Sequence, residues 1–172
     1  MDEYIVDHDT LAIKPYKHIK YNAKIFTKYG IYKSTYTPFE IIKESCERYF
    51  TSYEARRRAT IRYTNFRHKV PIIISKYFNI LAFPTNSPSL FHTNWIFVNN
   101  IVHIFKIGNY RSEILYNNGT KIPFNISSQN LQRQLTRSYA LMHIVGMIKN
   151  GIITEIKMPK ANKLKSLQVF LD

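Results

Sequence analysis

The chain has 172 residues, 45% of them apolar and 15% aromatic, so it is long enough to bury a core and its composition argues against intrinsic disorder. Its 25 Lys and Arg residues outnumber its 11 Asp and Glu residues, and the resulting formal net charge of +14 favours a polyanionic partner. An acidic N-terminus, the lack of an apolar run approaching ~20 residues and a lone cysteine predict no signal peptide, no membrane span and a reducing, cytoplasmic location.

The first part of the chain alternates apolar and polar residues in short runs. Residues 4–37 contain the runs LAIKPY, AKIFTKY and YKSTYT, and Pro15 and Gly30 interrupt them. Runs of this length with turn residues between them are typical of strands joined by tight turns. We therefore expect short antiparallel strands over residues 4–37.

A helix is predicted over residues 38–50. Thr37 and Glu40 have the spacing of a capping box, and proline occupies the first helical position between them. Apolar residues then recur at helical spacing, and Cys46 falls on the same face. A cysteine among apolar neighbours is more often a buried small hydrophobe than a reactive thiol, so we expect Cys46 to lie in the core.

The centre of the chain contains one short helix and several strands. After a break at Thr51 and Ser52, residues 53–59 are predicted to form a helix that carries arginines. Apolar and β-branched segments predict strands over residues 70–75, 79–83, 95–107, 112–116 and 121–126. Residues 84–89 have the composition of a loop, and Asn118-Gly119 predicts the tight turn of a hairpin because these residues readily adopt positive φ values.

A long final helix is predicted over residues 127–150. Ser127 or Ser128 caps its start, and Asn150 with Gly151 ends it. The residues expected on its apolar face are Leu131, Leu135, Tyr139, Met142 and Val145. Residues 157–172 form a basic and then apolar tail. Together these elements predict a single α+β domain over residues 1–172, mainly antiparallel sheet with the 38–50 and 127–150 helices packed on it.

Positive charge is concentrated in the centre and the C-terminal part of the sequence. Residues 1–50 have eight Lys and Arg against seven Asp and Glu, whereas no acidic residue lies between Glu54 and Glu113. Guanidinium groups bind phosphates and are drawn into narrow, A/T-rich minor grooves, so double-stranded DNA is a suitable partner. The candidate DNA-binding residues are Arg56, Arg57, Arg58, Arg62, Arg67, His68 and Lys69. No segment has the bulky apolar face of a basic amphipathic helix, so no membrane partner is predicted.

The sequence favours binding over catalysis. Its six histidines are scattered, it has no phosphate-binding glycine loop, and only three carboxylate side chains follow Glu54. We therefore predict no metal site, no cofactor and no enzymatic activity. Two alternatives stay open: a non-specific nucleic-acid or RNA-binding module, and a metal-free nuclease that uses His68 or His103 with an arginine.

Several uncommon motifs occur in a fixed order along the chain. They are Ser45-Cys46, Ser52-Tyr53-x-x-Arg56-Arg57, His68-Lys69-x-Pro71-Ile72, Phe83-Pro84-Thr85-x-Ser87 and Trp95-Ile96, followed by Asn118-Gly119, Ile126-Ser127, Gln134 and Arg137. This combination, over roughly residues 38–141, resembles the competence transcription factor ComK family of low-GC Gram-positive bacteria. No motif is specific by itself, and the resemblance depends on their order.

The resemblance implies a sequence-specific DNA-binding activator of DNA-uptake genes rather than an enzyme. Members of the family bind paired A/T-rich boxes of duplex DNA largely through the minor groove, bend the DNA and act as homodimers, with two dimers on one promoter. RNA polymerase is a further partner that this role implies. The match at Arg56, Arg57 and Lys69 supports their assignment to DNA binding, with Ser52 and Tyr53 in a supporting loop.

Several residues have two interpretations each. Gln134 and Arg137 lie one turn apart on the last helix, where they contact the DNA backbone, or Arg137 instead pairs with an acid such as Glu113. His68 donates to a phosphate or is a structural histidine. Trp95 lies in an apolar strand and is expected to pack in the core rather than to stack on bases.

The chain departs from the family pattern at two places. Thr93 stands where the family pattern has cysteine. The family's C-terminal extension, which carries an apolar-aromatic motif bound by a proteolytic adaptor, has only a loose counterpart in the final SLQVFLD. Control by such an adaptor is therefore not expected, and a paralogue with altered regulation is the alternative.

Overall fold

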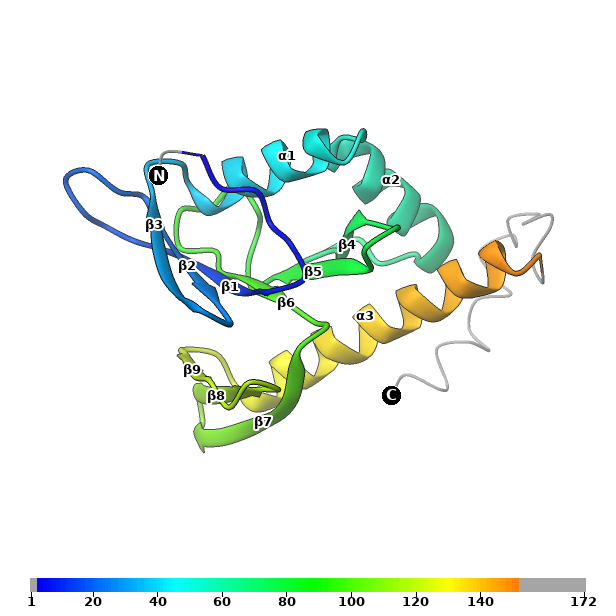
Figure 1. Cartoon of the computed structure of the whole chain (residues 1–172). Coiled ribbons are helices and arrows are strands. Elements are labelled where there is room, and N and C mark those ends of the chain that lie inside the picture. The colour runs from blue at the N-terminus through cyan, green and yellow to red at the C-terminus, as the bar shows by residue number, and fades with distance from the viewer. Residues whose placement is uncertain (1–2, 152–172) are drawn as a thin grey trace.

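The architecture consists of two antiparallel β-sheets and three helices, in a computed structural model that describes residues 3–151 (Figure 1). In chain order the elements are β1 (Thr10–Pro15), β2 (Ala23–Thr27), β3 (Gly30–Ser34), α1 (Pro38–Arg48), α2 (Tyr53–Thr64), β4 (Ile72–Ser75), β5 (Ile80–Pro84), β6 (Trp95–Phe97), β7 (Ile101–Gly108), β8 (Arg111–Tyr116), β9 (Lys121–Phe124) and α3 (Ser128–Lys149). The predicted α+β class with mainly antiparallel sheet is confirmed. The predicted tail over residues 157–172 lies outside the described residues, and the assignment of residues 1–172 to one domain stays a prediction.

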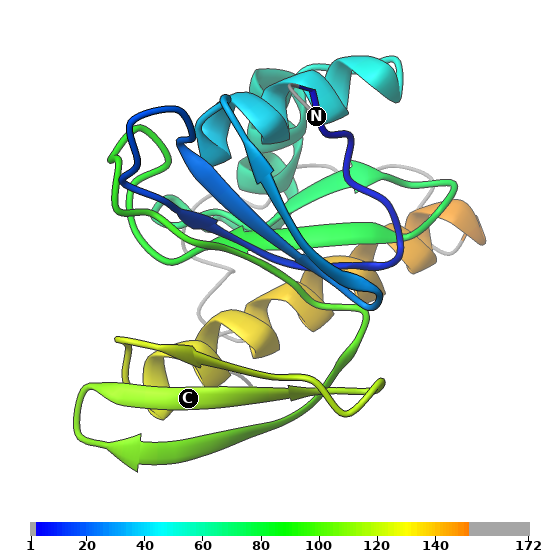
Figure 2. The ribbon, with the colours of Figure 1, turned by 60° about the vertical axis from the view of Figure 1, so that its left-hand side comes forward.

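The six-stranded sheet is the centre of the structure. Its strand order is β3-β2-β1-β6-β5-β4, and every neighbouring pair is antiparallel. Helices α1 and α2 cover one face of this sheet, while α3 and the small sheet β7-β8-β9 lie on the other (Figures 1 and 2). The molecule is therefore layered, with the six-stranded sheet in the middle.

Each face of the central sheet contributes to its own hydrophobic core. The core under α1 and α2 includes Ile13, Ile25, Ile41, Ile42, Ile72 and Trp95. The core toward α3 and the small sheet includes Leu11, Leu81, Phe83, Ile96, Tyr116 and Leu131. A strand that is buried on both faces has no polar side, which is why β5 has the continuous apolar sequence ILAFP. The prediction that Trp95 packs in the core is confirmed, because its side chain is fully buried.

Helix α1 forms where its capping signals predict. The Thr37 hydroxyl accepts a hydrogen bond from the N–H of Glu40, and the Glu40 carboxylate accepts one from the N–H of Thr37. The helix ends at Arg48, two residues earlier than predicted, and Phe50 then adopts a left-handed conformation with φ 57°. Cys46 is buried as predicted, and burial raises the pKa of its thiol to about 12, so the thiol is unreactive at neutral pH.

Helix α2 is longer than predicted. It continues to Thr64 instead of ending at Ala59, because no helix-breaking residue occurs before Asn65. Asn65 ends the helix in a left-handed conformation with φ 60°. As a result Arg62 belongs to the same helix as the three consecutive arginines.

The prediction of one strand over residues 95–107 is wrong, because the segment is divided between β6 and β7 in different sheets. Asn99 and Asn100 lie at the division. The Asn100 amide donates to the carbonyl of His8 at 2.8 Å, and Asn99 accepts from the N–H of Leu81 at 3.4 Å. The N–H of Ile101 donates to the carbonyl of Val98 at 3.2 Å in a turn, and the two asparagine side chains hold this turn against distant backbone, so the strand does not continue.

Helix α3 begins and ends close to the predicted positions, with Ser127 as its cap, but the expected apolar face is partly wrong. Its buried residues are Leu131, Gln134, Leu135, Ser138 and Leu141. Tyr139 and Met142 are exposed, whereas Val145 packs against the core as expected. Ser138 can be buried because its hydroxyl donates to the carbonyl of Gln134, one turn earlier, at 2.8 Å. A pattern of apolar residues does not predict a buried serine of this kind. Within residues 3–151, no helix is both long and apolar enough to cross a membrane.

Candidate nucleic-acid interface

The arginines of helix α2 divide between two environments. Arg58 and Arg62 are exposed and lie one turn apart on the outer side of the helix. Arg56 and Arg57 are half-buried. Arg56 lines a cavity with Lys76, and its Nε is buried without a hydrogen-bond partner among residues 3–151. Arg58 and Arg62 are therefore the two that present their guanidinium groups most openly to a phosphate.

Ser52 and Tyr53 hold the start of helix α2. The Ser52 hydroxyl accepts a hydrogen bond from the N–H of Ala55 at 3.2 Å, as an N-cap does. Tyr53 is buried with its ring centroid 4.9 Å from that of Phe39, and burial raises the pKa of its phenol to about 12. These two residues therefore position the helix, and Tyr53 presents little surface to a ligand.

Residues 65–71 connect α2 to β4 and carry three of the candidate residues. The side chains of Arg67, His68 and Lys69 are exposed, whereas Val70 is buried and anchors the loop. Lys69 adopts a left-handed conformation with φ 47°, which is uncommon for a residue other than glycine. Such a backbone persists when its surroundings hold it in place.

Helix α3 supplies the hydrogen bonds that hold this loop. Nε2 of Gln134 donates to the carbonyl oxygens of Lys69 at 2.8 Å and Pro84 at 3.3 Å. Nη2 of Arg137 donates to the carbonyl of His68 at 2.9 Å, and its Nη1 donates to Oε1 of Gln134 at 2.7 Å. Two side chains on one helix thus position a loop that lies 65 and 69 residues away in the sequence.

These bonds determine what the two side chains offer to a ligand. Gln134 is only 6% exposed and donates to two carbonyls, so it has no free N–H group for a phosphate. Arg137 is half-buried, with its guanidinium 4.3 Å from the centre of the Phe66 ring, and burial together with nearby Arg133 lowers its pKa. The alternative pair of Arg137 with Glu113 is not found in the described part of the chain, and Glu113 instead lies 3.8 Å from a lysine of β9.

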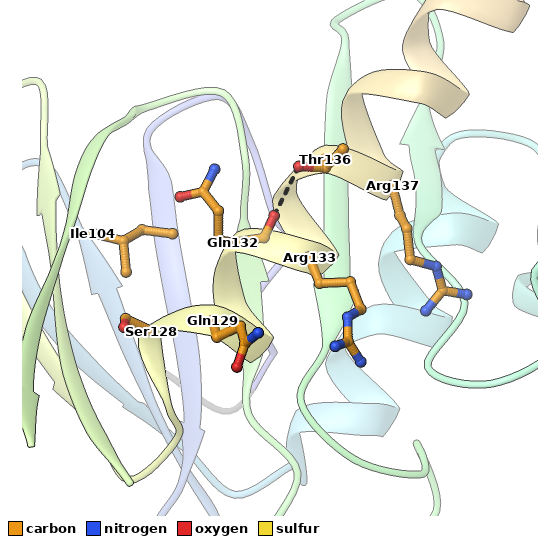
Figure 3. A pocket seen from close by; sticks show the side chains of 7 residues that line it. All are labelled: Ile104, Ser128, Gln129, Gln132, Arg133, Thr136 and Arg137. Atoms are coloured by element: carbon orange, nitrogen blue, oxygen red, sulfur yellow. Dashed lines mark hydrogen bonds between the residues drawn. The ribbon is translucent and has the colours of Figure 1, made fainter. Parts of the chain in front are cut away.

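Arg133 is a further candidate, which the sequence predictions omit. It lies one turn before Arg137 and is exposed. The two arginines border a groove of about 530 Å³ between α3 and β7, and both side chains extend to the same side (Figure 3). The remaining lining residues are Ile104, Ser128, Gln129, Gln132 and Thr136, so the groove has no carboxylate. The i, i+4 spacing of two arginines on a predicted helix is the signal that could have indicated Arg133.

Strand order brings three loops together at one end of the six-stranded sheet. The pairing registers place the C-terminal ends of β1 and β5 beside the N-terminal ends of β2, β4 and β6. Residues 16–22, 65–71 and 85–94 therefore form neighbouring loops, which we name the basic end. These loops contain four Lys or Arg residues, three His residues and no Asp or Glu. Figure 2 shows loops 16–22 and 85–94 side by side at its left.

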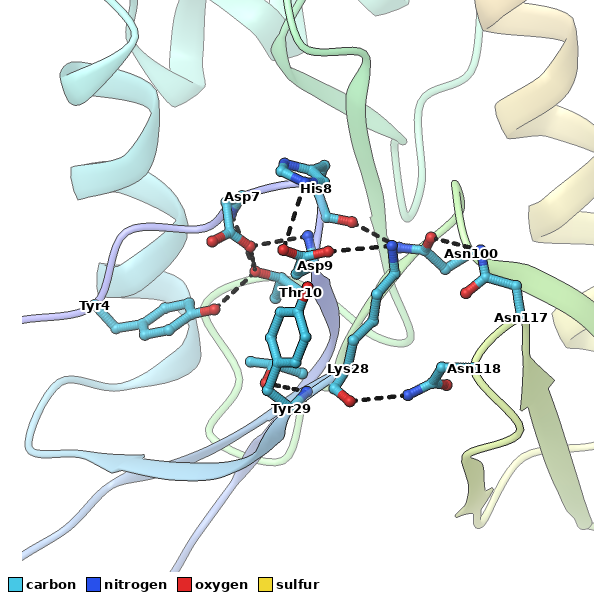
Figure 4. Close-up of polar contacts among 11 residues, drawn as sticks. Tyr4, Asp7, His8, Asp9, Thr10, Lys28, Tyr29, Asn100, Asn117 and Asn118 are labelled. Carbon is cyan, nitrogen blue, oxygen red and sulfur yellow. Dashed lines mark hydrogen bonds and ion pairs between the residues drawn. The ribbon is translucent and has the colours of Figure 1, made fainter.

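The opposite end of the same sheet contains a network of polar contacts, which we name the polar end (Figure 4). It comprises residues 7–10, 28–29, 99–100 and 117–118. The Asp9 carboxylate lies 3.1 Å from Nζ of Lys28 and 3.4 Å from Nε2 of His8. The Asn118 amide donates to the carbonyl of Lys28 at 3.1 Å, and the Asn100 amide donates to the carbonyl of His8 at 2.8 Å. These bonds join the small sheet to the central sheet, and Asp9 and Lys28 compensate each other's charge within the protein.

The two histidines considered for catalysis lie on different elements. His68 belongs to loop 65–71, whereas His103 is on β7 with its ring centroid 4.5 Å from that of Phe105. Within residues 3–151, no three His, Cys, Asp or Glu side chains are grouped so that they could hold a metal ion. The candidate surface therefore offers cations and hydrogen-bond donors, which is the chemistry of anion binding.

Comparisons with known proteins agree with the motif order. The sequence profile of the ComK family, described as “ComK protein”, matches residues 1–148. The “Competence transcription factor” of Bacillus subtilis (strain 168) is 28% identical over 142 residues, which cover 80% of this chain and 72% of that protein. No solved structure shows a significant match. Because the family profile covers nearly all of the described residues, including the loops of the basic end, the chain belongs to the ComK family.

Proposed function

We propose that this protein is a DNA-binding transcription activator of competence genes, which reads A/T-rich boxes of duplex DNA largely through the minor groove and bends them. Membership of the ComK family and the name of the Bacillus subtilis relative support this role. The structural observation that carries the proposal is the basic end, where exposed cations from separate loops lie together without a carboxylate. In this role the protein acts by binding in the cytoplasm, needs no cofactor, and occupies paired boxes as a homodimer.

The basic end has the properties that duplex binding requires. Arg67 and Lys69 extend from a backbone that α3 fixes, so the loop loses little conformational entropy when it binds. Cationic side chains contact phosphates and enter narrow minor grooves, where the negative potential is enhanced. The residues that we assign to DNA contact are Arg58, Arg62, Arg67, His68, Lys69 and Arg133, whereas Arg56 and Arg57 are half-buried and contribute less. Gln134 and Arg137 are positioning residues for the loop.

Competition between nucleic acids tests this function. The full chain is titrated with a labelled duplex that carries two A/T-rich boxes, at increasing salt concentration, with a G/C-rich duplex of equal length and an RNA as competitors. We expect the A/T-rich duplex to be preferred at every salt concentration, because groove shape still discriminates when salt weakens the phosphate contacts.

The other outcomes identify the alternatives. If the affinities for all three nucleic acids are equal and decline together as salt rises, the protein is a non-specific nucleic-acid-binding module. Progressive shortening of the nucleic acid in the same samples would indicate a nuclease instead.

A further inference from the structure

The loop over residues 16–22, at the tip of the β1–β2 hairpin, is held in shape by its own contacts. The N–H of Tyr16 donates to the carbonyl of Asn22 at 2.8 Å and closes the loop. The rings of Tyr16, His18 and Tyr21 stack in a row, with centroid separations of 5.3 Å and 5.5 Å. The Asn22 side chain also donates to a carbonyl just after β3 at 2.6 Å. The loop is therefore a preorganised projection of the sheet.

An isoleucine stands at the apex of this loop. Ile19 is 101% exposed, and the N–H of Lys20 bonds back to Nδ1 of His18 at 3.2 Å, which turns the chain at this point. Single exposed apolar residues are common on protein surfaces. Ile19 differs from them because it lies in the loop that joins β1 to β2, between Lys17 and Lys20. This loop projects beyond the strands of the sheet (Figure 1).

Lysines surround this loop, and no carboxylate lies near them in the sequence. Residues 10–39 contain six lysines and no Asp or Glu. Two of the six are engaged elsewhere, because Lys28 pairs with Asp9 and Lys14 donates to a carbonyl of β9. The remaining four are Lys17, Lys20, Lys24 and Lys33. None of these four has an ion-pair partner among the residues that the structure describes.

The aromatic stack holds part of this charge in place. Nζ of Lys24 and Nζ of Lys33 lie 4.0 Å and 5.7 Å from the centre of the Tyr16 ring, and Nζ of Lys20 lies 5.4 Å from that of Tyr21. Cations over aromatic faces at these distances are attracted to the rings. The loop thus has fixed cations at its base and an apolar side chain at its apex.

We propose that loop 16–22 is a second DNA-contacting element, in which Ile19 enters the minor groove as a wedge between base pairs and the four lysines bind phosphates beside it. This inference rests on the proposed function. Apolar wedges inserted from the minor groove partly unstack a base step and kink the duplex. The minor groove is only ~6 Å wide, so a narrow and rigid hairpin tip fits it better than a helix does.

The loop lies where it can share one duplex with residues 65–71. Three strand spacings separate β1 from β4 in the sheet order, which is about 14 Å at ~4.8 Å per strand. This separation corresponds to roughly four base pairs at ~3.4 Å each. Both loops therefore contact the duplex within one helical turn, and the wedge acts at a distance from Arg67 and Lys69, where it bends the DNA.

Variants at the apex test this inference in the full chain. Ile19→Ala removes the wedge and keeps every charge, so we expect the bend of an end-labelled A/T-rich duplex, measured by energy transfer, to fall by roughly half while affinity changes less than about tenfold. Lys17→Gln combined with Lys20→Gln should make the slope of log affinity against log salt shallower by about 1.8, because two phosphate contacts contribute ~0.9 each. Ile107→Ala, at an exposed isoleucine of β7, is the matched control and should leave both quantities unchanged.

A second readout reports directly on the apex. The single native tryptophan, Trp95, is fully buried, so Ile19→Trp places a distinct fluorophore at the tip. DNA that receives the tip should strongly quench this fluorophore.

The outcomes separate this inference from the proposed function. Failure of the wild-type chain to bind any duplex would contradict the function itself. Normal binding, bending and salt dependence in the apex variants, with no fluorescence change in Ile19→Trp, would overturn the role of the loop and leave the function standing. Binding to anionic phospholipid vesicles that requires Ile19, together with DNA bending that does not, would also overturn it and assign the loop to a membrane surface.

Discussion

The two ends of the six-stranded sheet carry charge in opposite ways. At the polar end, Asp9 pairs with Lys28, and the amides of Asn100 and Asn118 bond backbone carbonyls across the two sheets. At the basic end, the three loops contain cations and no acidic residue. The polar end pairs its charges within the protein, whereas the cations of the basic end have no ion-pair partner among residues 3–151.

This difference separates residues that stabilise the fold from residues that are available for binding. Unpaired like charges repel one another and contribute nothing to folding, so their removal should cost little stability. Partly buried ion pairs and buried amides do stabilise the fold, so their removal should lower the free energy of unfolding. Three sets of variants test whether the two ends differ in this way.

The largest effect is expected from reversing charge at the basic end and at Arg133 of α3, which borders a cavity with His68 and Lys69. Arg67→Glu combined with Arg133→Glu turns two attractive contacts into repulsive ones, and we expect affinity for the A/T-rich duplex to fall by at least about a hundredfold. The free energy of unfolding should change by less than about 0.5 kcal/mol, because both side chains are exposed. Fluorescence anisotropy and urea denaturation measure the two quantities.

Asp9→Asn at the polar end is the control for which we expect the reverse result, a loss of stability without a loss of DNA binding. It removes a partly buried ion pair, and we expect the free energy of unfolding to fall by about 1 kcal/mol with unchanged DNA affinity. If Asp9→Asn weakened DNA binding as much as the arginine variants, the distinction between the two ends would not hold.

A smaller effect on DNA binding, together with a loss of stability, is expected at Gln134, which holds loop 65–71 of the basic end. Gln134→Leu leaves the carbonyls of Lys69 and Pro84 without their donor, so the free energy of unfolding should fall by about 1–3 kcal/mol. DNA affinity should fall as well, because loop 65–71 loses its support. Gln132→Leu, at an exposed position of the same helix, should leave stability within about 0.5 kcal/mol of wild type. Equal stability of the two variants would show that the amide of Gln134 does not hold the loop.

The smallest effect concerns Lys14, a lysine that belongs to neither end. It donates to the carbonyl of Pro123 and lies 4.4 Å from the centre of the Phe124 ring, and burial, with a contribution from Lys24, lowers its pKa from 10.5 to about 8. Between these two pH values the unfolded chain binds more protons than the folded one, so the free energy of unfolding should rise with pH from this group.

The measurement compares wild type with Lys14→Met by urea denaturation at pH 7 and pH 9. The difference between the two proteins isolates Lys14, because every other titrating group is present in both. We expect wild type to gain about 1 kcal/mol or less relative to the variant at the higher pH, after allowance for solvent screening. Parallel pH profiles would mean that Lys14 does not titrate as a buried group.

Local chemistry was sufficient to predict most elements. The capping box of α1 depends only on Thr37, Glu40 and the proline between them, and the β8–β9 hairpin depends on Asn118-Gly119, so both were predicted correctly. The division of residues 95–107 depends on bonds from Asn99 and Asn100 to distant backbone groups, and it was not predicted. The buried face of α3 was also not fully predicted, because Ser138 is buried with its hydroxyl hydrogen-bonded to a backbone carbonyl.

The candidate site was predictable only in part, for the same reason. A stretch without acidic residues indicated Arg67, His68 and Lys69 as cationic candidates. The hydrogen bonds of Gln134 to carbonyls 65 and 50 residues away could not be inferred from its own neighbours. Loop 16–22 was missed because acids at both ends of residues 1–50 cancel its lysines in a count over that whole segment.

The sequence by itself determined the net positive charge, the α+β class, the helix caps and the order of motifs that the ComK family shares, because each of these depends on residue types and their spacing along the chain. Only the tertiary structure decided which cations lie together. Strand order, rather than distance along the chain, makes loops 16–22, 65–71 and 85–94 neighbours, and it places Asp9 and Lys28 at the opposite end. Hydrogen bonds from α3 then hold one of these loops, since a backbone carbonyl accepts any donor that the fold brings to it.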